Sequence, residues 1–254
     1  MEFHDKIVLV TGAAVGIGRE TASAFAAEGA TVIVNYSRSE QEALETCRVI
    51  RESGGRAYPI QADVSQEDDV LRMMREIESR FGHLDILVNN AGITDFIPFP
   101  DLDKANAEVW DRLYNVNVKG VFFCCREAAK LMSGRNGANI VNLSSQAGMR
   151  AMGSSIPYSV SKAAVIHLTQ CLAVALAPGI RVNCVSPGVI ENTRWNAGRK
   201  DFSPEENRRE NSAHIPLRRL GQPKDVAEAI LFLAGKGDYC NGTILPVDGG
   251  RIIV

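Results

Sequence analysis

The chain alternates between short apolar runs and longer amphipathic segments almost from end to end, and this alternation narrows the possible folds more than any other feature. The apolar runs have the length and β-branched content of buried strands: Lys6–Val10, Thr31–Val34, Tyr58–Gln61, Ile86–Asn89, Asn139–Leu143, Arg181–Val185 and Thr243–Val247. Helical periodicity fills the segments between them: Gly16–Glu28, Ser39–Ser53, Ser65 to about Phe81, a long helix within Lys104–Met132, Tyr158–Ala177 and Pro223–Ala234. Strands and helices that alternate in this way form a parallel sheet with helices on both faces, joined by right-handed crossovers. We therefore predict an α/β fold with a doubly wound, seven-stranded parallel sheet.

At 254 residues the chain fits one large domain. No internal repeat, low-complexity segment or linker interrupts it. The one long irregular stretch is Gly188–Gly221, and a loop of that length in a compact domain is typically a lid or a partly disordered insertion. We predict a single domain over residues 1–254, with a substrate lid around residues 189–220.

Charge and composition argue against several kinds of partner. The formal net charge of -2 gives nucleic acid and anionic membranes little to attract. No apolar stretch is long enough to cross a bilayer, and Met1–Asp5 does not begin a secretory signal. The six cysteines include no Cys-x-x-Cys pair and the four histidines are scattered. We therefore expect free buried thiols, no metal site and a reducing, cytoplasmic location.

A glycine-rich turn, Thr11-Gly12-Ala13-Ala14-Val15-Gly16-Ile17-Gly18, follows the first predicted strand and opens the first helix. Glycines let the backbone turn tightly and approach a ligand, and a helix N-terminus offers free N–H groups to a pyrophosphate. The spacing Gly-x-x-x-Gly-x-Gly differs from the Gly-x-Gly-x-x-Gly fingerprint, and a turn without a ligand is the alternative. The position between strand and helix favours a dinucleotide, and the expected contacts are Gly12, Ala14, Gly16, Ile17 and Gly18.

The end of the second predicted strand indicates which dinucleotide is bound. An NAD site usually has an acidic residue there, bonded to the ribose hydroxyls. The segment after Val34 has no carboxylate that would repel a 2′-phosphate, and Arg38 could bind that phosphate through a charge-assisted contact. We therefore predict NADP in preference to NAD, although Arg38 could also be a solvated cation. The expected contacts in this segment are Asn35, Tyr36, Ser37 and Arg38.

Tyr158 and Lys162 are four residues apart on a predicted helix and therefore share a face. An ammonium group near a phenol favours the phenolate and lowers the pKa of the tyrosine, which suits general acid–base work on an alcohol or carbonyl oxygen. The pair alone is weak evidence, since a surface tyrosine packed on a lysine has the same spacing. Ser144 and Ser145 follow the fifth predicted strand, at the sheet edge where such folds bind ligands.

Taken together, these motifs resemble the short-chain dehydrogenase/reductase family over nearly the whole chain. The motifs that carry the resemblance occur in the family's order: Thr11-Gly12-x-x-x-Gly16-x-Gly18, Asp63-Val64, Asn89-Asn90-Ala91-Gly92, Asn115-Val116-Asn117, Ser145, Tyr158-x-x-x-Lys162, Pro187-Gly188 and Val247-Asp248-Gly249-Gly250. The resemblance implies a Rossmann-type domain and an NAD(P)-dependent oxidoreductase that acts on CH–OH groups.

The resemblance also implies residue roles. Tyr158 is the expected general acid for ketone reduction and the base for alcohol oxidation, and Ser145 orients the substrate carbonyl. Lys162 binds the nicotinamide ribose and lowers the pKa of Tyr158. Asn117 is expected to hold a water-linked proton relay to Lys162, whereas Ser144 is the weaker candidate beside Ser145.

The remaining cofactor contacts come from the same resemblance. The residues implied are Asp63 and Val64 at the adenine, Asn90, Ala91 and Gly92 along the groove, and Pro187, Gly188 and Ile190, with Val189 as the alternative to Ile190, over the nicotinamide. Many relatives have a threonine five residues after this proline; here Asn192 holds that position and Thr193 follows, so either could reach the nicotinamide. The expected substrate pocket comprises Ser145, Gln146, Met152, Tyr158 and Trp195, with Thr94, Met149, Ile156 and Asn192 around them, although ordinary packing explains most of these positions equally well.

The sequence favours a carbonyl reductase that transfers a hydride between NADP(H) and a medium-sized ketone or secondary alcohol, rather than a strongly anionic substrate. The alternatives are a 3-oxoacyl-[acyl-carrier-protein] reductase and a sugar or polyol dehydrogenase. Arg135 lies near one carrier-docking position, but Pro178-Gly179 occupies the place of the second basic residue. A nucleotide-sugar epimerase would need a longer chain, and a non-enzymatic sensor would often lack Tyr158 or Lys162. The resemblance implies a homotetramer, and the apolar end Ile252-Ile253-Val254 fits an interface.

Overall fold

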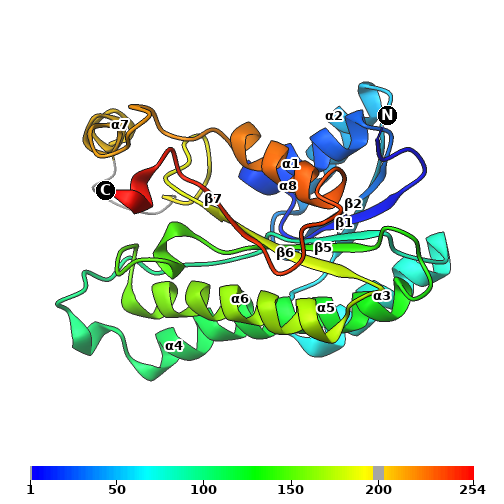
Figure 1. Ribbon diagram of the computed structural model, residues 1–254, viewed down its shortest axis with the longest axis horizontal. Helices are drawn as coiled ribbons and strands as arrows, with labels where there is room; N and C mark the ends of the chain where they lie inside the picture. The colour runs from blue at the N-terminus through cyan, green and yellow to red at the C-terminus, as the bar shows by residue number, and fades with distance from the viewer. Residues whose placement is uncertain (1, 197–202) are drawn as a thin grey trace.

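The computed structural model, which describes residues 2–196 and 203–254, is built around one parallel sheet (Figure 1). Its seven strands are β1 (Ile7–Val10), β2 (Thr31–Tyr36), β3 (Arg56–Gln61), β4 (Ile86–Asn89), β5 (Asn139–Leu143), β6 (Arg181–Pro187) and β7 (Ile244–Val247). The α-helices are α1 (Gly16–Ala27), α2 (Glu40–Glu52), α3 (Glu67–Phe81), α4 (Ala107–Tyr114), α5 (Val121–Leu131), α6 (Ile156–Ala175), α7 (Pro204–Ala213) and α8 (Pro223–Ala234). The predicted α/β class and doubly wound sheet are confirmed.

The strands lie in the order β3-β2-β1-β4-β5-β6-β7, so the chain reverses its direction of travel across the sheet between β1 and β4. Val10 of β1 is in register with Val34 of β2 and with Val88 of β4. All these strands are parallel, and their carboxyl ends therefore meet at one edge. Ligands of doubly wound folds bind outside this edge, at the point of reversal.

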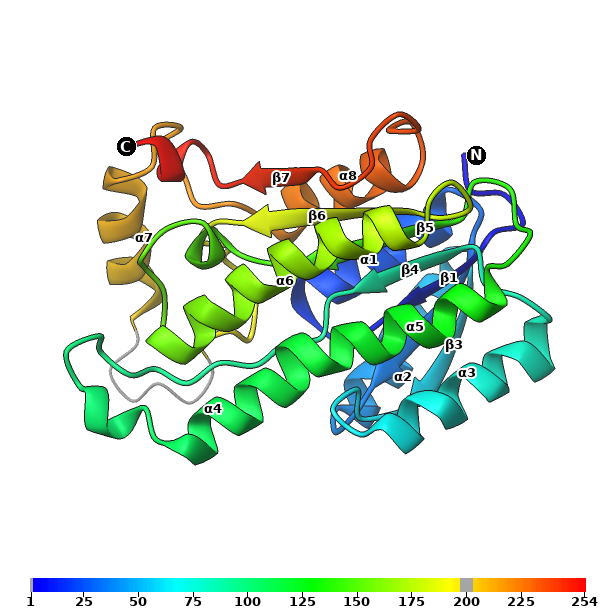
Figure 2. The ribbon, with the colours of Figure 1, turned by 60° about the horizontal axis from the view of Figure 1, so that its bottom comes forward.

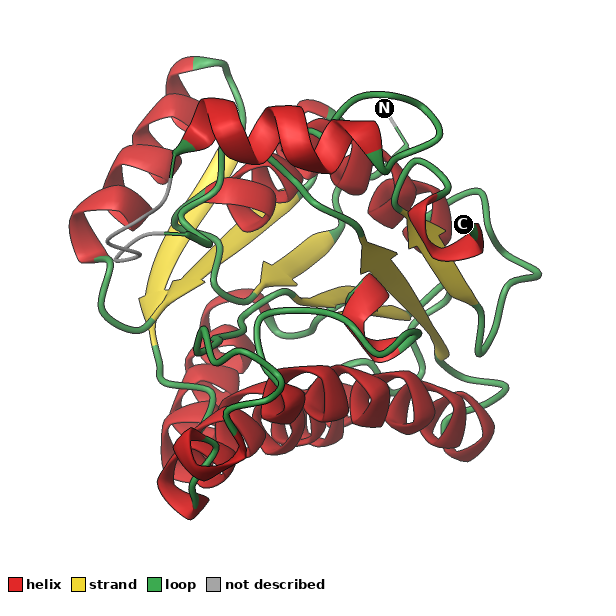
Figure 3. Cartoon of the chain, turned by 90° about the vertical axis from the view of Figure 1, so that its left-hand side faces the viewer, coloured by secondary structure: helices red, strands yellow, loops and turns green. Residues whose placement is uncertain are grey.

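Helices cover both faces of the sheet (Figures 2 and 3). Side chains of a strand point alternately to its two faces, and β1 illustrates the result: Val8 and Val10 pack with α1, α2 and α8, whereas Ile7 and Leu9 pack with α3, α5 and α6. All four side chains are buried. The near-continuous apolar runs in the sequence are therefore strands that contribute to two cores at once.

Two segments differ from the sequence prediction. The long helix expected within Lys104–Met132 is α4 and α5 joined by a π-helical turn, Asn115–Gly120. The stretch Gly188–Gly221, expected to be irregular, contains α7. Ser203 caps α7 by accepting a hydrogen bond from the Glu206 N–H at 3.3 Å, and proline and glutamate follow in the first turn. That order is a recognised helix start, so the signal was present in the sequence.

The other sequence expectations about the chain as a whole have mixed outcomes. All six cysteines are free, but Cys171 is exposed rather than buried. Within residues 2–196 and 203–254, no helix combines the length and the apolar character needed to cross a membrane. In the same residues, no group of three or more His, Cys, Asp or Glu side chains is arranged to hold a metal ion.

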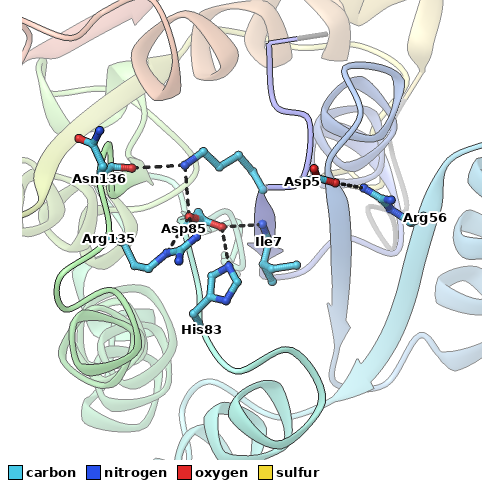
Figure 4. A network of polar contacts seen from close by, with 8 residues as sticks. Asp5, Ile7, Arg56, His83, Asp85, Arg135 and Asn136 are labelled. Carbon is cyan, nitrogen blue, oxygen red and sulfur yellow. Dashed lines mark hydrogen bonds and ion pairs between the residues drawn. The ribbon is translucent and has the colours of Figure 1, made fainter.

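A buried carboxylate ties the first and fourth strands together at the edge opposite the ligand edge (Figure 4). Asp85, just before β4, accepts hydrogen bonds from the Ile7 N–H at 2.9 Å, from Lys6 at 3.3 Å and from Arg135 at 3.0 Å, and His83 lies 3.1 Å away. Burial alone would raise the pKa of Asp85, but the Ile7 hydrogen bond and the charges of Arg135 and Lys6 outweigh it and hold the pKa below its ordinary value.

We expect Asp85→Ala to lower the free energy of unfolding by about 3 kcal/mol, because two cations and one buried N–H lose their acceptor. A carboxylate whose pKa is depressed by folding contributes stability above its unfolded pKa and loses it as pH falls through the folded value. The difference between wild type and variant should therefore shrink below about pH 4. Urea unfolding measures both effects. Glu45→Ala, which breaks an exposed ion pair with Arg48, is the control and should change stability little; an equal effect of the two substitutions would contradict this account.

Candidate functional site

A cavity of about 1960 Å³ follows the carboxyl edge of the sheet. The turn after each central strand contributes to its wall: Gly12 after β1, Asn90 after β4 and Ser145 after β5, together with Asn35 of β2 and Pro187 of β6. This is the edge and the point of strand reversal at which the sheet topology predicts a ligand.

The glycine-rich turn after β1 has a shape that only glycine permits. Gly12 and Gly16 have φ angles of +62° and +58°, which other residues rarely adopt. A Cβ on Gly18 would lie 2.5 Å from Asn90 Nδ2. The N-cap residue of α1, Val15, gives no side-chain acceptor, and no acidic residue stands in the first turn. The first N–H groups of α1 therefore remain available, and the turn fits the pyrophosphate of a dinucleotide.

Two asparagines hold this turn in place. Asn35 Oδ1 accepts from the Gly12 N–H at 3.2 Å. Asn90 Nδ2 donates to the carbonyl oxygens of Thr11 at 2.9 Å and Gly12 at 3.0 Å. In return, Thr11 Oγ1 accepts from the backbone N–H groups of Asn90 and Ala91, at 3.1 Å and 3.0 Å. The turns after β1 and β4 are therefore one hydrogen-bonded unit, although they are far apart in the sequence.

The wall beyond Asn35 carries the residues expected at the adenosine. Ser37, Arg38, Asp63 and Val64 all line the cavity. Arg38 is exposed and forms no ion pair with any residue that the structure describes. Asp63 is engaged locally, since its carboxylate accepts from the N–H and the hydroxyl of Ser65 at 2.9 Å and 2.7 Å. This end of the cavity thus offers one uncompensated cation.

Three residues expected to contact the cofactor do not line the cavity: Ala14, Gly18 and Tyr36. Tyr36 is buried, and its hydroxyl lies 3.4 Å from Glu40. Ala14 is also buried, with its carbonyl bonded to Thr46. A strand alternates its side chains between faces, so the residue next to the cavity-lining Asn35 points away.

Tyr158, Lys162 and Ser145 come together at the middle of the cavity, and all three line it. Ser155 caps α6 by accepting from the Tyr158 N–H at 3.3 Å, which starts the helix two residues earlier than predicted. The Lys162 ammonium lies 5.9 Å from the centre of the Tyr158 ring and donates to the Leu143 carbonyl at 3.0 Å.

The loop that carries Ser145 is pressed against α6. A Cβ on Gly148 would lie 2.6 Å from the carbonyl carbon of Lys162. Ser144 donates its hydroxyl to the Lys162 carbonyl oxygen at 2.7 Å, and is therefore committed to holding loop and helix together. Ser145 Oγ accepts from the Ala147 N–H at 3.2 Å, and its own proton remains available for another acceptor. Both serines line the cavity, but the hydroxyl of Ser145, unlike that of Ser144, is not committed to α6.

The electrostatics of this group differ from the sequence expectation. Burial raises the pKa of Tyr158 to about 12, although its hydrogen bond with Ser145 acts in the opposite direction. Burial also lowers the pKa of Lys162 to about 8, against a smaller opposing effect of Cys184. The expected lowering of the Tyr158 pKa by Lys162 is therefore not found in the protein alone, because both groups lose their water on burial. Tyr158 is fully protonated at neutral pH.

Asn117 lies in the π-helical turn and is fully buried. Its Oδ1 accepts from the Ile93 N–H at 2.9 Å, and its Nδ2 donates to the Ile93 carbonyl and to Ser161 Oγ, both at 3.0 Å. A Cβ on Gly92 would stand 3.4 Å from both Asn117 Oδ1 and Lys162 Nζ. The side chain thus fixes the strand-end loop beside Lys162 and makes no direct bond to the ammonium.

The residues expected at the nicotinamide lie at the end of β6 and in the segment that follows it. Pro187, Gly188 and Ile190 line the cavity. Of the two alternatives for the next contact, Thr193 lines the cavity and its Cβ lies 3.5 Å from the position of a Cβ on Gly16. Asn192 turns away and donates to Gln222 at 2.9 Å. The structure thus favours Thr193 over Asn192 as the residue that faces the cofactor.

At the far end of the cavity, Gln146, Met152 and Trp195 line the wall as expected, and the Trp195 ring centre lies 5.2 Å from that of Tyr158. Thr94 also lines it, whereas Met149, Ile156 and Asn192 do not. Gln146 Oε1 is buried without a partner in the described part of the chain, so a donor from a substrate would relieve the cost of burying it. The lining also includes residues that the sequence reasoning did not name, among them Arg112, Asn207, Asn211 and Arg251.

Known proteins match this chain in sequence and in fold over nearly its whole length. A family profile described as "Enoyl-(Acyl carrier protein) reductase" matches residues 12–251. The putative ketoacyl reductase 2 of the granaticin polyketide synthase of Streptomyces violaceoruber is 41% identical over 245 residues, which cover 96% of this chain and 95% of that protein. The structure of a short chain dehydrogenase from Burkholderia cenocepacia J2315 in complex with NADP superimposes with a TM-score of 0.88 at 35% identity, over 99% of each chain. The chain belongs to the short-chain dehydrogenase/reductase family.

This dehydrogenase/reductase is thus an oxidoreductase that acts on alcohol or ketone groups, and its family binds NAD(P). A 3-oxoacyl-[acyl-carrier-protein] reductase of Staphylococcus aureus is 40% identical over 248 residues, with 96% of this chain and 97% of the relative covered. The glycine turn with its free helix N–H groups fits the pyrophosphate of such a cofactor, which agrees with the family assignment.

Proposed function

We propose that this chain is a carbonyl reductase that transfers a hydride between NADP(H) and a ketone or secondary alcohol. The observation that carries the proposal is the buried, protonated Tyr158 beside Ser145 and Lys162, in the middle of a cavity that begins at the phosphate-binding turn. A phenol with this environment can give a proton to a carbonyl oxygen at neutral pH.

Each residue of the group has a role in reduction. The cofactor supplies the hydride to the carbonyl carbon. Ser145 donates a hydrogen bond to the carbonyl oxygen, and Tyr158 donates the proton that completes the alcohol. Lys162 holds the ribose hydroxyls of the cofactor, and Asn117 keeps the loop beside Lys162 in place, where a water can link the ammonium to solvent. In oxidation the same atoms act in reverse.

The preference for NADP(H) rests on Arg38. It lines the cavity with no carboxylate partner among the described residues, and Ser37 stands beside it. A 2′-phosphate would provide the missing counter-charge, whereas the ribose hydroxyl of NAD would not.

We expect Arg38→Gln to weaken NADPH binding by about tenfold and to leave NADH binding within about twofold, since one charge-assisted contact is worth about 1.4 kcal/mol. Fluorescence titration with each cofactor measures this. Arg48→Gln is the matched control, because Arg48 lies on α2, the helix that follows Arg38, but pairs with Glu45 and Glu52 outside the cavity. Equal loss of affinity for both cofactors would contradict the proposed role.

A 3-oxoacyl reductase is the second candidate, favoured by the names of the Streptomyces and Staphylococcus relatives. Against it, Arg135 is engaged by Asp85 through Nε at 3.2 Å and Nη2 at 3.0 Å, and is poorly placed to dock an acidic carrier protein. NADPH oxidation with a panel of β-keto esters, diketones, steroids, sugars and acetoacetyl thioesters tests the proposal. A rate only with the thioesters would favour the second candidate, oxidation of sugars or polyols alone would favour a dehydrogenase, and no rate with any compound would overturn both reductase proposals.

Two further proposals concern the surroundings of the site. Residues 189–220 act as a lid over the substrate: Ile190 and Gly221 pair at its base, and Arg208 and Gln222 both contact Glu191 there. Residues 197–202 of this lid lie outside the described residues.

The chain forms a homotetramer. This proposal is supported by exposed apolar side chains on α5, on α6 and at residues 253 and 254, namely Phe122, Val160, Val174, Ile253 and Val254. The free thiols support a reducing, cytoplasmic location.

A further inference from the structure

Arg251 stands at the substrate end of the cavity, far from the cofactor turn. It follows the paired glycines after β7 and lines both the main cavity and a second one of about 580 Å³. Met152 lines the same two cavities. Met152 is tied to the catalytic helix, because its carbonyl accepts from the Ser159 hydroxyl at 2.6 Å, next to Tyr158. Arg251 therefore borders the space that a substrate held at Tyr158 would extend into.

The backbone around Arg251 is firmly anchored. Arg150, from the loop that carries Ser145, donates to the carbonyl oxygens of Arg251 and Ile252, both at 3.2 Å, and to that of Val254. Asp248 accepts from the N–H groups of Gly250 and Ile252, at 2.9 Å and 2.8 Å. These contacts fix the backbone of Arg251 relative to the loop that carries Ser145. A fixed position is needed if the arginine is to bind a substrate group at a defined distance from the catalytic residues.

The guanidinium of Arg251 is partly buried and lacks a counter-ion. Its Nη1 donates a hydrogen bond to a neutral group, Asn211 Oδ1, at 2.6 Å. Asn211 in turn donates to Asn207 Oδ1 at 2.9 Å, and both asparagines line the cavity from α7. No carboxylate lies within ion-pair distance of Arg251 in residues 2–196 and 203–254. Burial lowers the pKa of Arg251, opposed by the charge of Asp248, as expected for a cation short of partners.

Arg112, the other arginine on this part of the wall, provides the contrast. It is paired with Asp95, which also lines the cavity. Of these two cations, only Arg251 lacks a carboxylate partner among the described residues, and a planar guanidinium matches a carboxylate in geometry.

We propose that Arg251 binds a carboxylate of the substrate, so that the preferred substrates are keto acids and the corresponding hydroxy acids. The inference rests on the proposed reductase function and deepens it by naming the substrate class. It departs from the expectation, drawn from the sequence, that the substrate is not strongly anionic. In reduction, the hydride goes to the ketone carbon and the Tyr158 proton to its oxygen, while the carboxylate stays unchanged at Arg251. Asn211 orients the guanidinium and is a positioning residue.

The test uses methyl ketone acids of the series CH3CO(CH2)nCO2⁻ and the methyl ester of each, with NADPH as the reductant. Ester and acid present the same ketone to Tyr158, so their ratio of kcat/KM isolates the charge at the far end. At the chain length that spans the cavity, we expect wild type to prefer the acid by about 10- to 100-fold, mostly through KM. If no acid in the series is preferred over its ester, the inference fails, whereas reduction of the esters still upholds the proposed function.

Three variants sharpen the result. Arg251→Gln should bring the acid-to-ester ratio of kcat/KM close to one, and Arg251→Lys should keep part of the preference. Arg112→Gln is the matched control and should leave the ratio unchanged, since its charge is already neutralised. An equal fall of the ratio in Arg112→Gln would show a general charge effect and overturn the assignment, as would an unchanged ratio in Arg251→Gln. If neither acids nor esters nor other ketones react, the proposed function fails and the inference fails with it.

Discussion

Tyr158→Phe should lower kcat for ketone reduction by about 10³-fold or more while NADPH binds with near-normal affinity. The substitution removes one oxygen from a buried ring and leaves the packing against Trp195 intact. Without the phenol, the wall offers Ser145 as a hydrogen-bond donor but no acid whose proton can be given up and recovered. Initial rates of NADPH oxidation and a fluorescence titration with NADPH measure the two quantities separately.

The matched control is Tyr114→Phe, because Tyr114 is an exposed tyrosine at the end of α4 that does not line the cavity. It should leave both quantities unchanged. The pKa of about 12 for Tyr158 adds a pH signature: at pH 7 the group is ready to donate a proton, whereas alcohol oxidation needs the phenolate and should become faster as pH rises. Reduction by Tyr158→Phe at more than a third of the wild-type rate would contradict the assigned role.

Lys162→Met should abolish most turnover, by at least about 100-fold, and yet stabilise the protein without cofactor by about 2 kcal/mol at pH 7. The folded pKa of Lys162, about 8, is below its ordinary value of 10.5 because the ammonium is buried. A pKa depression of that size corresponds to about 3 kcal/mol of destabilisation, which the substitution removes. The substitution also removes the hydrogen bond to Leu143, and this loss reduces the gain by about 1 kcal/mol. Methionine fills the same space without a charge.

The sign of this effect depends on pH. Below pH 8 Lys162 is charged in the folded protein, and the destabilisation by the buried charge is fully present. Between pH 8 and 10.5 the folded state loses this proton before the unfolded state does, so the stability of the wild type rises with pH. The advantage of Lys162→Met should therefore be largest at pH 7 and nearly absent at pH 10.5. Urea unfolding at the two pH values tests this, with the exposed Lys130→Met as the control. A variant less stable than wild type at pH 7 would contradict the argument.

The fold could be predicted from the sequence because strand and helix periodicities are local properties. The runs around Val8 and Val34 can only be buried on both faces, and the amphipathic segments between them supply the covering layers. The errors are also local in origin. The helix start at Ser203 and Pro204 was overlooked within a polar stretch. The π-helical turn at Asn115–Gly120 was missed because one wider turn barely changes the helical periodicity of the sequence.

The site could be predicted only in part. Motif positions located Ser145, Tyr158 and Lys162, but burial decides their pKa values, and burial is a property of the packed molecule. In the segment after Val34, the sequence alone could not distinguish residues that face the cavity from residues that face away, because this depends on the register of β2. Tyr36 was therefore wrongly expected to contact the cofactor. Arg251 and Asn211 are 40 residues apart in the sequence and form a hydrogen bond in the structure, and neither belongs to a recognised sequence motif.

The anchored tail from Asp248 to Val254 has a consequence for how enzymes of this kind diversify. The strands of the sheet and the phosphate-binding turn are built from residues before Asp248, whereas Arg251 of the tail lines the cavity together with Met152 and is held by Arg150. A gene duplicate can therefore acquire a new chemical preference through changes in the codons for residues 250–254, with the sheet and the phosphate-binding turn left as they were inherited.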